Sequence, residues 1–133
     1  MDLQIIQNKI FEIRGCRVML DFHLAELYGV QTKVLKQAVK RNEKRFPSDF
    51  RFTMTKEEWH ELVTNCDQLP ESLKHSYVLP DCFTEQGVAM LSSVLRSQTA
   101  IDVNISIMRA FVLMRQMSIG YEELLKRIEE LEQ

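Results

Sequence analysis

Residues 21–40, DFHLAELYGVQTKVLKQAVK, constrain the fold more than any other segment of the chain. Apolar side chains recur at helical spacing on both sides of a glycine: Leu24, Tyr28, Val30, Leu35 and Ala38. Small Ala25 allows a second helix to approach closely, and Gly29 can adopt the left-handed backbone that ends a helix. We therefore predict a helix-turn-helix, with Val30 and Leu35 closing the small core between its two helices.

The ends of these helices are also marked in the sequence. Asp21 is a suitable N-cap for the first helix, because a short acidic side chain can accept a hydrogen bond from a free backbone N–H. The second helix should run from Gln31 to about Asn42, since Pro47 follows soon afterwards and cannot continue it.

The outward positions of the second helix are polar or basic, and none is acidic. They are Gln31, Thr32, Lys33, Lys36, Gln37 and Lys40. Each of these side chains can hydrogen-bond a base edge or a phosphate, which is typical of a recognition helix in a DNA major groove. A plain pair of antiparallel helices with solvated lysines has the same pattern. This segment alone therefore leaves both interpretations open.

The distribution of charge favours DNA. The chain carries a formal net charge of −2, which by itself argues mildly against a nucleic-acid partner. Between Gln31 and Arg51, however, seven basic residues oppose only two acidic ones, whereas Tyr121 to Gln133 holds five glutamates against two basic residues. A phosphate backbone responds to the local field of such a patch and not to the total charge.

Length and composition predict one soluble, cytoplasmic domain. A chain of 133 residues can bury a core of its own, and no apolar run is long enough to cross a membrane. The N-terminus lacks the basic start and apolar stretch of a signal peptide. Cys16, Cys66 and Cys82 form no CxxC pair, so we expect reduced thiols that act as small core residues.

The first twenty residues predict a β-hairpin. Ile5, Ile6 and residues 10–13 supply strand-forming side chains, Arg14-Gly15 marks a turn, and residues 16–20 return. Asp21 follows directly.

A further strand is predicted after the second helix. Residues 50–54 alternate so that the phenylalanines point inward. If the preceding Phe46-Pro47 turn stands out as a wing, Arg45 and Arg51 would touch phosphate or a minor groove. If the turn packs inward, they are ordinary surface charges.

The middle of the chain shows two helix starts. Thr55 to Glu58 form a capping box for a helix through about Val63, and residues 64–76 predict a loop. A short strand near 77–83, broken by Pro80, should lead to a helix capped by Thr84, with a buried stripe of Val88, Leu91, Val94 and Leu95. The start of that helix favours a simple cap, although its free N–H groups could hold a DNA phosphate.

The last third of the chain predicts one long helix with a heptad seam. Its apolar positions step by three or four residues: Ala100, Val103, Ile107, Ala110, Met114, Met117, Tyr121, Leu124, Ile128 and Leu131. Such a helix would extend roughly 48 Å, more than a core of this size can cover. We therefore expect a domain over residues 1–117 and a tail over 118–133, weakened at Ser118 and Gly120. The tail should either pair with another helix, as a parallel coiled coil that gives a homodimer through residues 100–131, or form a disordered end or linker. Because the chain stops inside a charged heptad, we expect further sequence to follow.

An enzymatic function finds little support. His23, His60 and His75 lie on different predicted elements, and no serine elbow or phosphate-binding glycine loop is present. Cys66 and His60 would need two further ligands to hold zinc. We expect no catalytic residue, no metal, no cofactor and no small-molecule substrate.

Three segments resemble a known family. RFPSDFRF at 45–52, LPDCFTEQGVAMLSSVL at 79–95 and VNISIMRAFVLMR at 103–115 resemble the ORF6N domain, of the KilA-N and Bro-N related group in phages, large DNA viruses and bacteria. The resemblance covers roughly residues 9–117. It implies DNA binding, often by the N-terminal module of an antirepressor-like or regulatory phage protein, with another domain following. It names no contact residues.

Taken together, the sequence predicts an α+β, non-catalytic domain that binds double-stranded DNA. The candidates for base contacts are Gln31, Thr32, Lys33 and Gln37. The candidates for phosphate contacts are Lys36, Lys40, Arg41, Lys44 and Arg45, with Arg51 if the wing forms. A dimer would read a palindrome with half-sites about one helical turn apart. The alternative is a protein-interaction module that captures a repressor or another acidic partner.

Overall fold

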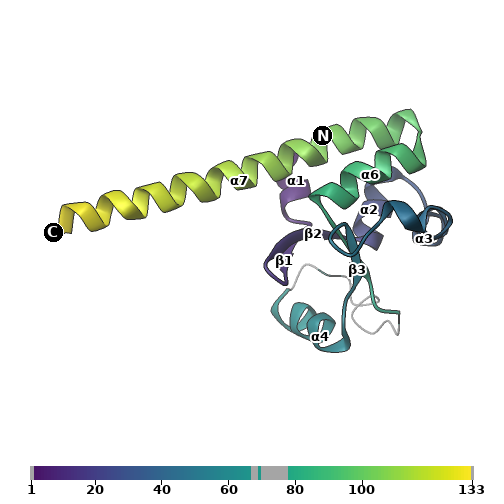
Figure 1. Cartoon of the computed structure of the whole chain (residues 1–133), viewed down its shortest axis with the longest axis horizontal. Coiled ribbons are helices and arrows are strands. Elements are labelled where there is room, and N and C mark those ends of the chain that lie inside the picture. Colours follow the sequence, from purple (N-terminus) through teal and green to yellow (C-terminus); the bar gives the residue numbers. More distant parts are fainter. Residues whose placement is uncertain (1, 67–68, 70–77, 133) are drawn as a thin grey trace.

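The structure is a computed structural model that describes residues 2–66, 69 and 78–132. The helices are α1 (Leu3–Gln7), α2 (Asp21–Tyr28), α3 (Thr32–Arg41), the 3-10 turn η1 (Glu43–Arg45), α4 (Lys56–Asn65), α6 (Glu85–Leu95) and α7 (Gln98–Glu132). The strands are β1 (Ile10–Ile13), β2 (Cys16–Leu20), β3 (Arg51–Thr53) and β4 (Asp81–Thr84). They form an antiparallel sheet of order β1-β2-β4-β3, shown with its helices in Figure 1. The predicted α+β class is confirmed.

The N-terminal hairpin is confirmed, but its first strand is shorter than predicted. Ile13 pairs with Cys16 across a two-residue turn, and Arg14 and Gly15 have φ angles of 56° and 74°. Two positive φ values define the turn type whose twist matches that of paired strands. The prediction of strand at Ile5 and Ile6 is wrong, because these residues lie in α1. Fully buried Ile6 packs with α7 residues in one core cluster, which outweighs its preference for strand.

The sheet separates two apolar clusters because successive side chains along a strand point to opposite faces. Met19 and Phe83 belong to the larger cluster, formed with α1, α2, α3, α6 and α7. Val18, Leu20 and Cys82 belong to the smaller one, which α4 covers through Trp59. Figure 1 shows α4 below the strands and the α6–α7 pair above them. Both faces of the sheet are therefore covered.

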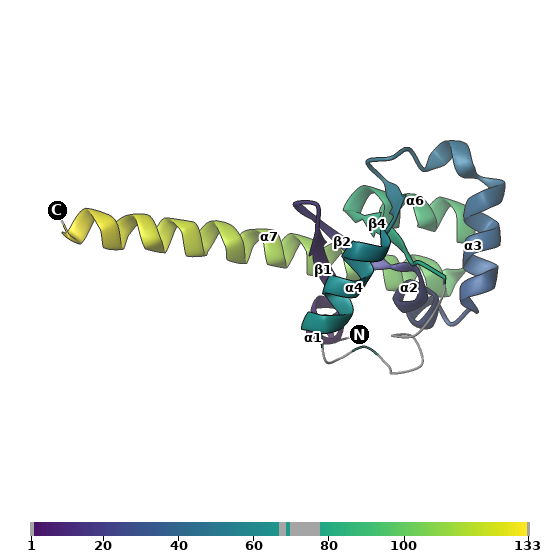
Figure 2. The same cartoon turned by 90° about the horizontal axis from the view of Figure 1, so that it is seen from below.

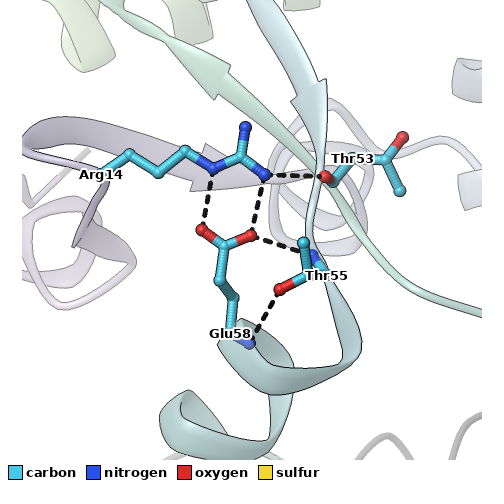
Figure 3. A network of polar contacts seen from close by, with 4 residues as sticks. All are labelled: Arg14, Thr53, Thr55 and Glu58. Atoms are coloured by element: carbon cyan, nitrogen blue, oxygen red, sulfur yellow. Dashed lines mark hydrogen bonds and ion pairs between the residues drawn. The ribbon is translucent and has the colours of Figure 1, made fainter.

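The hairpin turn is tied to α4 by a bidentate ion pair, drawn in Figure 3. Arg14 Nε lies 2.8 Å from Glu58 Oε2, and its Nη2 donates to Glu58 Oε1 at 2.9 Å. The guanidinium also lies over the ring of Phe52, 4.2 Å from its centroid. Glu58 completes the predicted capping box, since Thr55 Oγ1 accepts from the Glu58 N–H and the Thr55 N–H donates to the carboxylate. The Glu58 side chain therefore stabilises both the start of α4 and the turn between β1 and β2.

The helix start at Thr84 is confirmed, and Gly87 is required there. Thr84 Oγ1 accepts from the Gly87 N–H at 3.3 Å and donates to Asp49 O at 2.8 Å. A Cβ at Gly87 would lie 2.0 Å from the carbonyl oxygen of Phe50. The chain before β3 therefore covers the first turn of α6, which supports the simple-cap interpretation.

Two other boundaries and the burial of one cysteine differ from the prediction. Strand β4 begins only at Asp81, so residues 78–80 are not strand, and position 77 lies outside the described residues. Thr64 and Asn65, predicted as part of a loop over 64–76, belong to α4, and residues 67–68 and 70–77 lie outside the described residues. Cys16 is exposed on β2, contrary to the expectation of a core residue, whereas Cys82 is buried.

Helix α7 runs unbroken through Ser118 and Gly120, where weakening was predicted. The Arg17 side chain on β2 donates to Ser118 Oγ, which joins this part of the helix to the sheet. Buried α7 residues extend from Ala100 to Phe111, and the helix then projects from the domain (Figure 1). No helix among the described residues has the combination of length and apolarity needed to cross a bilayer.

Candidate nucleic-acid interface

Helices α2 and α3 and the turn between them occur where the sequence places them. Gly29 has a φ of 72°, and the Val30 N–H donates to Ala25 O at 3.0 Å, which closes the end of α2. Leu35 and Val39 are the buried residues of α3, and Val30, predicted to close the core with Leu35, is half-buried against the larger cluster. Helix α3 begins at Thr32, one residue after the predicted start, because Gln31 is its cap residue.

The outer face of α3 is basic. Lys33, Gln37 and Lys40 are exposed and follow one another at spacings of four and three residues, so they lie on one side of the helix. Exposed Arg41 lies one turn beyond Gln37. Val34, which is 45% exposed, is the apolar member of this side. Helix α3 contains no acidic residue, so its exposed surface presents cations and an amide.

The basic surface continues past the end of α3 into η1. Residues 40–45 line an open groove of about 390 Å³, and four of these six residues are lysine or arginine. Lys44 and Arg45 are both exposed, and Arg45 also donates to Ser93 Oγ at 3.1 Å. Cations at the C-terminal end of a helix suit its dipole. The groove therefore extends the positive surface of α3 by one further turn.

Lys36 is held differently from its neighbours. Its Nζ lies 3.4 Å from Asp21 Oδ2, and the Asp21 side chain is only 3% exposed. The Asp21 carboxylate also accepts from the Phe22 N–H at 2.7 Å and from the Asp81 N–H at 3.0 Å. Burial raises the pKa of Asp21, while the Asp81 N–H and the Lys36 charge act in the opposite direction. Lys36 therefore offsets a buried negative charge and is one third exposed.

The prediction that Asp21 is the N-cap of α2 is wrong, because Asp21 is the first residue of this helix. Leu20 occupies the cap position and makes no side-chain hydrogen bond there. The Asp21 carboxylate instead accepts from the start of β4. The sequence signal for this role is that Asp21 directly follows an apolar strand, where its carboxylate would be buried and would need a cation such as Lys36.

The turn at Phe46-Pro47 packs inward. Phe46 is buried with its ring edge-on to Phe83, 5.9 Å between centroids. The following strand, β3, is an edge strand of the sheet and pairs with β4. Arg51 Nη1 lies 3.2 Å from Asp81 Oδ2, so its charge is paired within the sheet. Of the two alternatives for this turn, the geometry matches the one without a protruding wing.

Other polar sites suit phosphate less well. A cavity of about 510 Å³ beside the start of α6 is lined by Arg17 and Arg115 but also by Glu12, Asp49 and Glu85. Arg115 Nη1 is paired with Glu85 Oε1 at 2.6 Å. The described residues hold no group of three or more histidines, cysteines or carboxylates that could bind a metal ion. His60 is exposed on α4, His23 is buried on α2, and residue 75 lies outside the description.

The basic face of α3 lies at one end of the molecule. In both views α3 is at the opposite end from the C-terminus of α7, as Figure 2 shows most clearly. Thr32, predicted as a base contact, is half-buried beside Lys36 and lines a small pocket with Trp59. Gln31, Lys33, Gln37, Lys40, Arg41, Lys44 and Arg45 are all exposed, on α3, its cap residue and η1, and are together called the α3 surface below.

Fold and surface define a mixed α+β domain with a basic helix at one end. The chain matches the family of the ORF6N domain over residues 8–94, more than half of its length. It therefore belongs to the ORF6N domain family, as the sequence resemblance predicted. The match ends within α6, so it includes the α3 surface but not α7. No curated protein and no solved structure matches the chain.

Proposed function

We propose that this protein is the non-catalytic DNA-binding domain of a phage-type regulatory, antirepressor-like protein. In this proposal α2 and α3 act as a helix-turn-helix, and α3 enters the major groove of double-stranded DNA. The observation that supports it most directly is the exposed face of α3, where Lys33, Gln37 and Lys40 align without any acidic residue on the helix. Membership of the ORF6N family agrees with a regulatory role of this kind.

The residues of the α3 surface divide into two roles. Gln31, Lys33 and Gln37 lie on the N-terminal half, where a recognition helix contacts bases, and amide and ammonium groups suit adenine and guanine edges. Lys40, Arg41, Lys44 and Arg45 would hold phosphates and fix the register. Lys36 and Arg51, paired with Asp21 and Asp81, would mainly hold the protein together.

A protein-interaction module is the second candidate, favoured by one observation. Val34 is 45% exposed among the cations of α3, and an apolar side chain ringed by charges also suits a protein interface. The partner would be acidic, for example a captured repressor. The two candidates differ in salt dependence, because binding through many phosphates weakens log-linearly with salt concentration.

The test is fluorescence anisotropy of a labelled random-sequence duplex at several salt concentrations. The informative variant is Lys33→Glu, Lys40→Glu and Arg41→Glu, which reverses three exposed charges and spares Lys36, whose reversal would place two acids together. A matched control is Lys56→Glu, Arg109→Glu and Lys126→Glu, which makes the same charge change at exposed positions elsewhere. Circular dichroism would establish that both variants are folded.

We expect the wild-type protein and the control to bind with a steep salt slope. The α3 variant should lose at least about tenfold in affinity at low salt. Equal binding by the two variants would refute the assignment to α3. If the wild-type protein fails to bind at low salt, DNA binding is excluded and the interaction module is left as the candidate.

A further inference from the structure

Beyond the globular core, α7 carries an apolar stripe that nothing in the described chain covers. The stripe is formed by Met117, Tyr121, Leu124, Ile128 and Leu131, which are 60%, 63%, 55%, 44% and 86% exposed. Figure 1 shows this part of α7 projecting away from the sheet and the other helices. Residues 117–132 would extend roughly 22 Å at 1.5 Å per residue. Apolar surface aligned along one side of a free helix indicates a partner.

The spacing of the stripe is that of a coiled coil. Its members alternate between steps of four and three residues, the pattern of positions a and d of a heptad. In this register Met114, Tyr121 and Ile128 are at a, and Met117, Leu124 and Leu131 are at d. The same register includes Val103, Ile107 and Ala110, which are buried against the domain. The face that packs on the core therefore continues as a free seam where the core ends.

We propose that the seam binds a second copy of this chain as a parallel, two-stranded coiled coil over residues 117–132. The residue types at the seam support two strands, because a β-branched residue at a with leucine at d favours parallel dimers. Ile128 at a lies between Leu124 and Leu131 at d. Residues 121–133 carry five glutamates against two cations, so a nucleic acid or an anionic membrane surface is disfavoured as the partner of this segment.

Residues that flank the seam support the parallel direction. In a parallel pair, position g of one chain faces position e of the next heptad in the other chain. Arg127 at g would then face Glu132 at e of the second copy, which is an attractive pair. Leu125 at e, 41% exposed, would face Gly120 at g, where the space around a missing Cβ is empty. Glutamates 122, 123, 129 and 130 lie at b and c, away from the partner.

The parallel direction has a consequence for DNA binding, and this consequence alone rests on the proposed function. Both domains would lie at the N-terminal end of the paired helices, which must diverge N-terminal to Met117 because each domain covers the same face of its own α7 from Ala100 to Phe111. Each α3 would lie at the end of the molecule far from the tail (Figure 2). Two α3 surfaces could then contact one duplex and read a palindrome with half-sites about one helical turn apart. An antiparallel pair would place them at opposite ends.

Sedimentation equilibrium of the full chain without DNA tests the partner. We expect reversible dimerisation of the wild-type protein, and a monomer for Leu124→Glu. Ile119→Glu is the matched control, because Ile119 is 60% exposed but lies at position f, outside the seam. It should dimerise like the wild type. A wild-type monomer at every concentration, a higher oligomer, or equal loss in both variants would overturn the proposal.

Disulfide trapping tests the direction. With Leu131→Cys, a parallel pair places the two new thiols together, and mild oxidation should give a covalent dimer. Lys126→Cys at position f, run alongside, shows how much trapping arises from the native cysteines and from random collision. If Leu131→Cys sediments as a dimer but is trapped no better than Lys126→Cys, the parallel arrangement is wrong.

A charge exchange tests the register. Arg127→Glu should weaken dimerisation several-fold, because the new glutamate would face Glu132 of the second copy. The double variant Arg127→Glu with Glu132→Arg should restore dimerisation. Absence of restoration would refute the facing of these two positions. All these measurements are made without DNA, so a dimer that fails to bind any duplex would overturn the proposed function alone. A monomer that still binds DNA would overturn this inference alone.

Discussion

Lys36 on α3 lies 3.4 Å from the carboxylate of Asp21, a side chain that is almost completely buried at the start of α2. The same carboxylate accepts the Asp81 N–H from β4. One acid therefore joins two helices and a strand beneath the α3 surface. This arrangement separates Lys36 from its basic neighbours, since its charge is needed within the domain.

Removing Lys36 should therefore destabilise the protein through Asp21. Lys36→Met leaves the buried carboxylate without its cation, and we expect a loss of about 1 kcal/mol in the free energy of unfolding, discounted because Lys36 is partly exposed. Asp21→Asn removes the buried charge but sets an amide N–H against one of the two backbone N–H groups that Asp21 accepts from, so it destabilises the protein by itself. The further loss caused by Lys36→Met should nevertheless be much smaller in the Asp21→Asn background than in the wild type. Urea denaturation of the four proteins at neutral pH measures this cycle. Equal losses with and without Asp21→Asn would contradict the coupling.

The pair of Arg14 and Glu58 should make stability depend on acid pH. Hydrogen bonds from Arg14 and from the Thr55 N–H lower the pKa of Glu58 from 4.5 to about 2. A carboxyl group with a lowered pKa in the folded state stabilises the fold above its unfolded pKa, and this stabilisation disappears as the pH falls from 4.5 to about 2. Glu58→Gln should therefore show a flatter decline than the wild type over this window. Parallel curves from thermal unfolding at a series of pH values would contradict the prediction.

Gly87→Ala should destabilise the domain although alanine favours helices. Its Cβ would lie 2.0 Å from the Phe50 carbonyl oxygen, so the backbone before β3 would have to move, at a cost of about 2 kcal/mol or more. The control is Gly120→Ala in α7, where a Cβ meets nothing within 4 Å. That substitution should stabilise the helix by up to about 1 kcal/mol. Chemical denaturation compares the two, and equal effects would show that Gly87 is not sterically required.

Gln37 and Lys44 should affect DNA binding in different ways if α3 enters the major groove. Gln37→Ala should relax the preference for particular bases in a selection from random duplexes, with an unchanged salt slope. Lys44→Ala should weaken binding to all sequences alike and reduce the salt slope by about 1. The proposed roles would be wrong if the two variants behaved alike in both measurements.

Local chemistry explains which parts of the fold could be read from the sequence. Gly29, the capping box at Thr55 and the cap at Thr84 each act within a few residues, and all three were predicted. Helix α1 was missed because the strand preference of its isoleucines is outweighed by packing on α7, which is distant in the sequence. The late start of β4 at Asp81 depends on pairing with β2 and β3, and this pairing leaves no local signal.

In the candidate site, too, local features could be predicted from the sequence and contacts between distant residues could not. The basic residues of α3 were found from spacing and residue type alone. Their different surroundings were not, because the partners of Lys36 and Arg51 are 15 and 30 residues away in the sequence, at Asp21 and Asp81. The inward packing of the Phe46 turn likewise depends on Phe83, a contact that alternating residues cannot reveal.

The continuity of α7 has a mechanical consequence. A single helix from Gln98 to Glu132 is part of the core at one end and free at the other, with no flexible joint between them. A partner bound to the free end would therefore also fix the rotation of the whole domain about the axis of α7. In an assembly built through this helix, the separation and facing of the two heads would be set by helical phase, and inserting or deleting a single residue between Met114 and Met117 would rotate each head by about 100°.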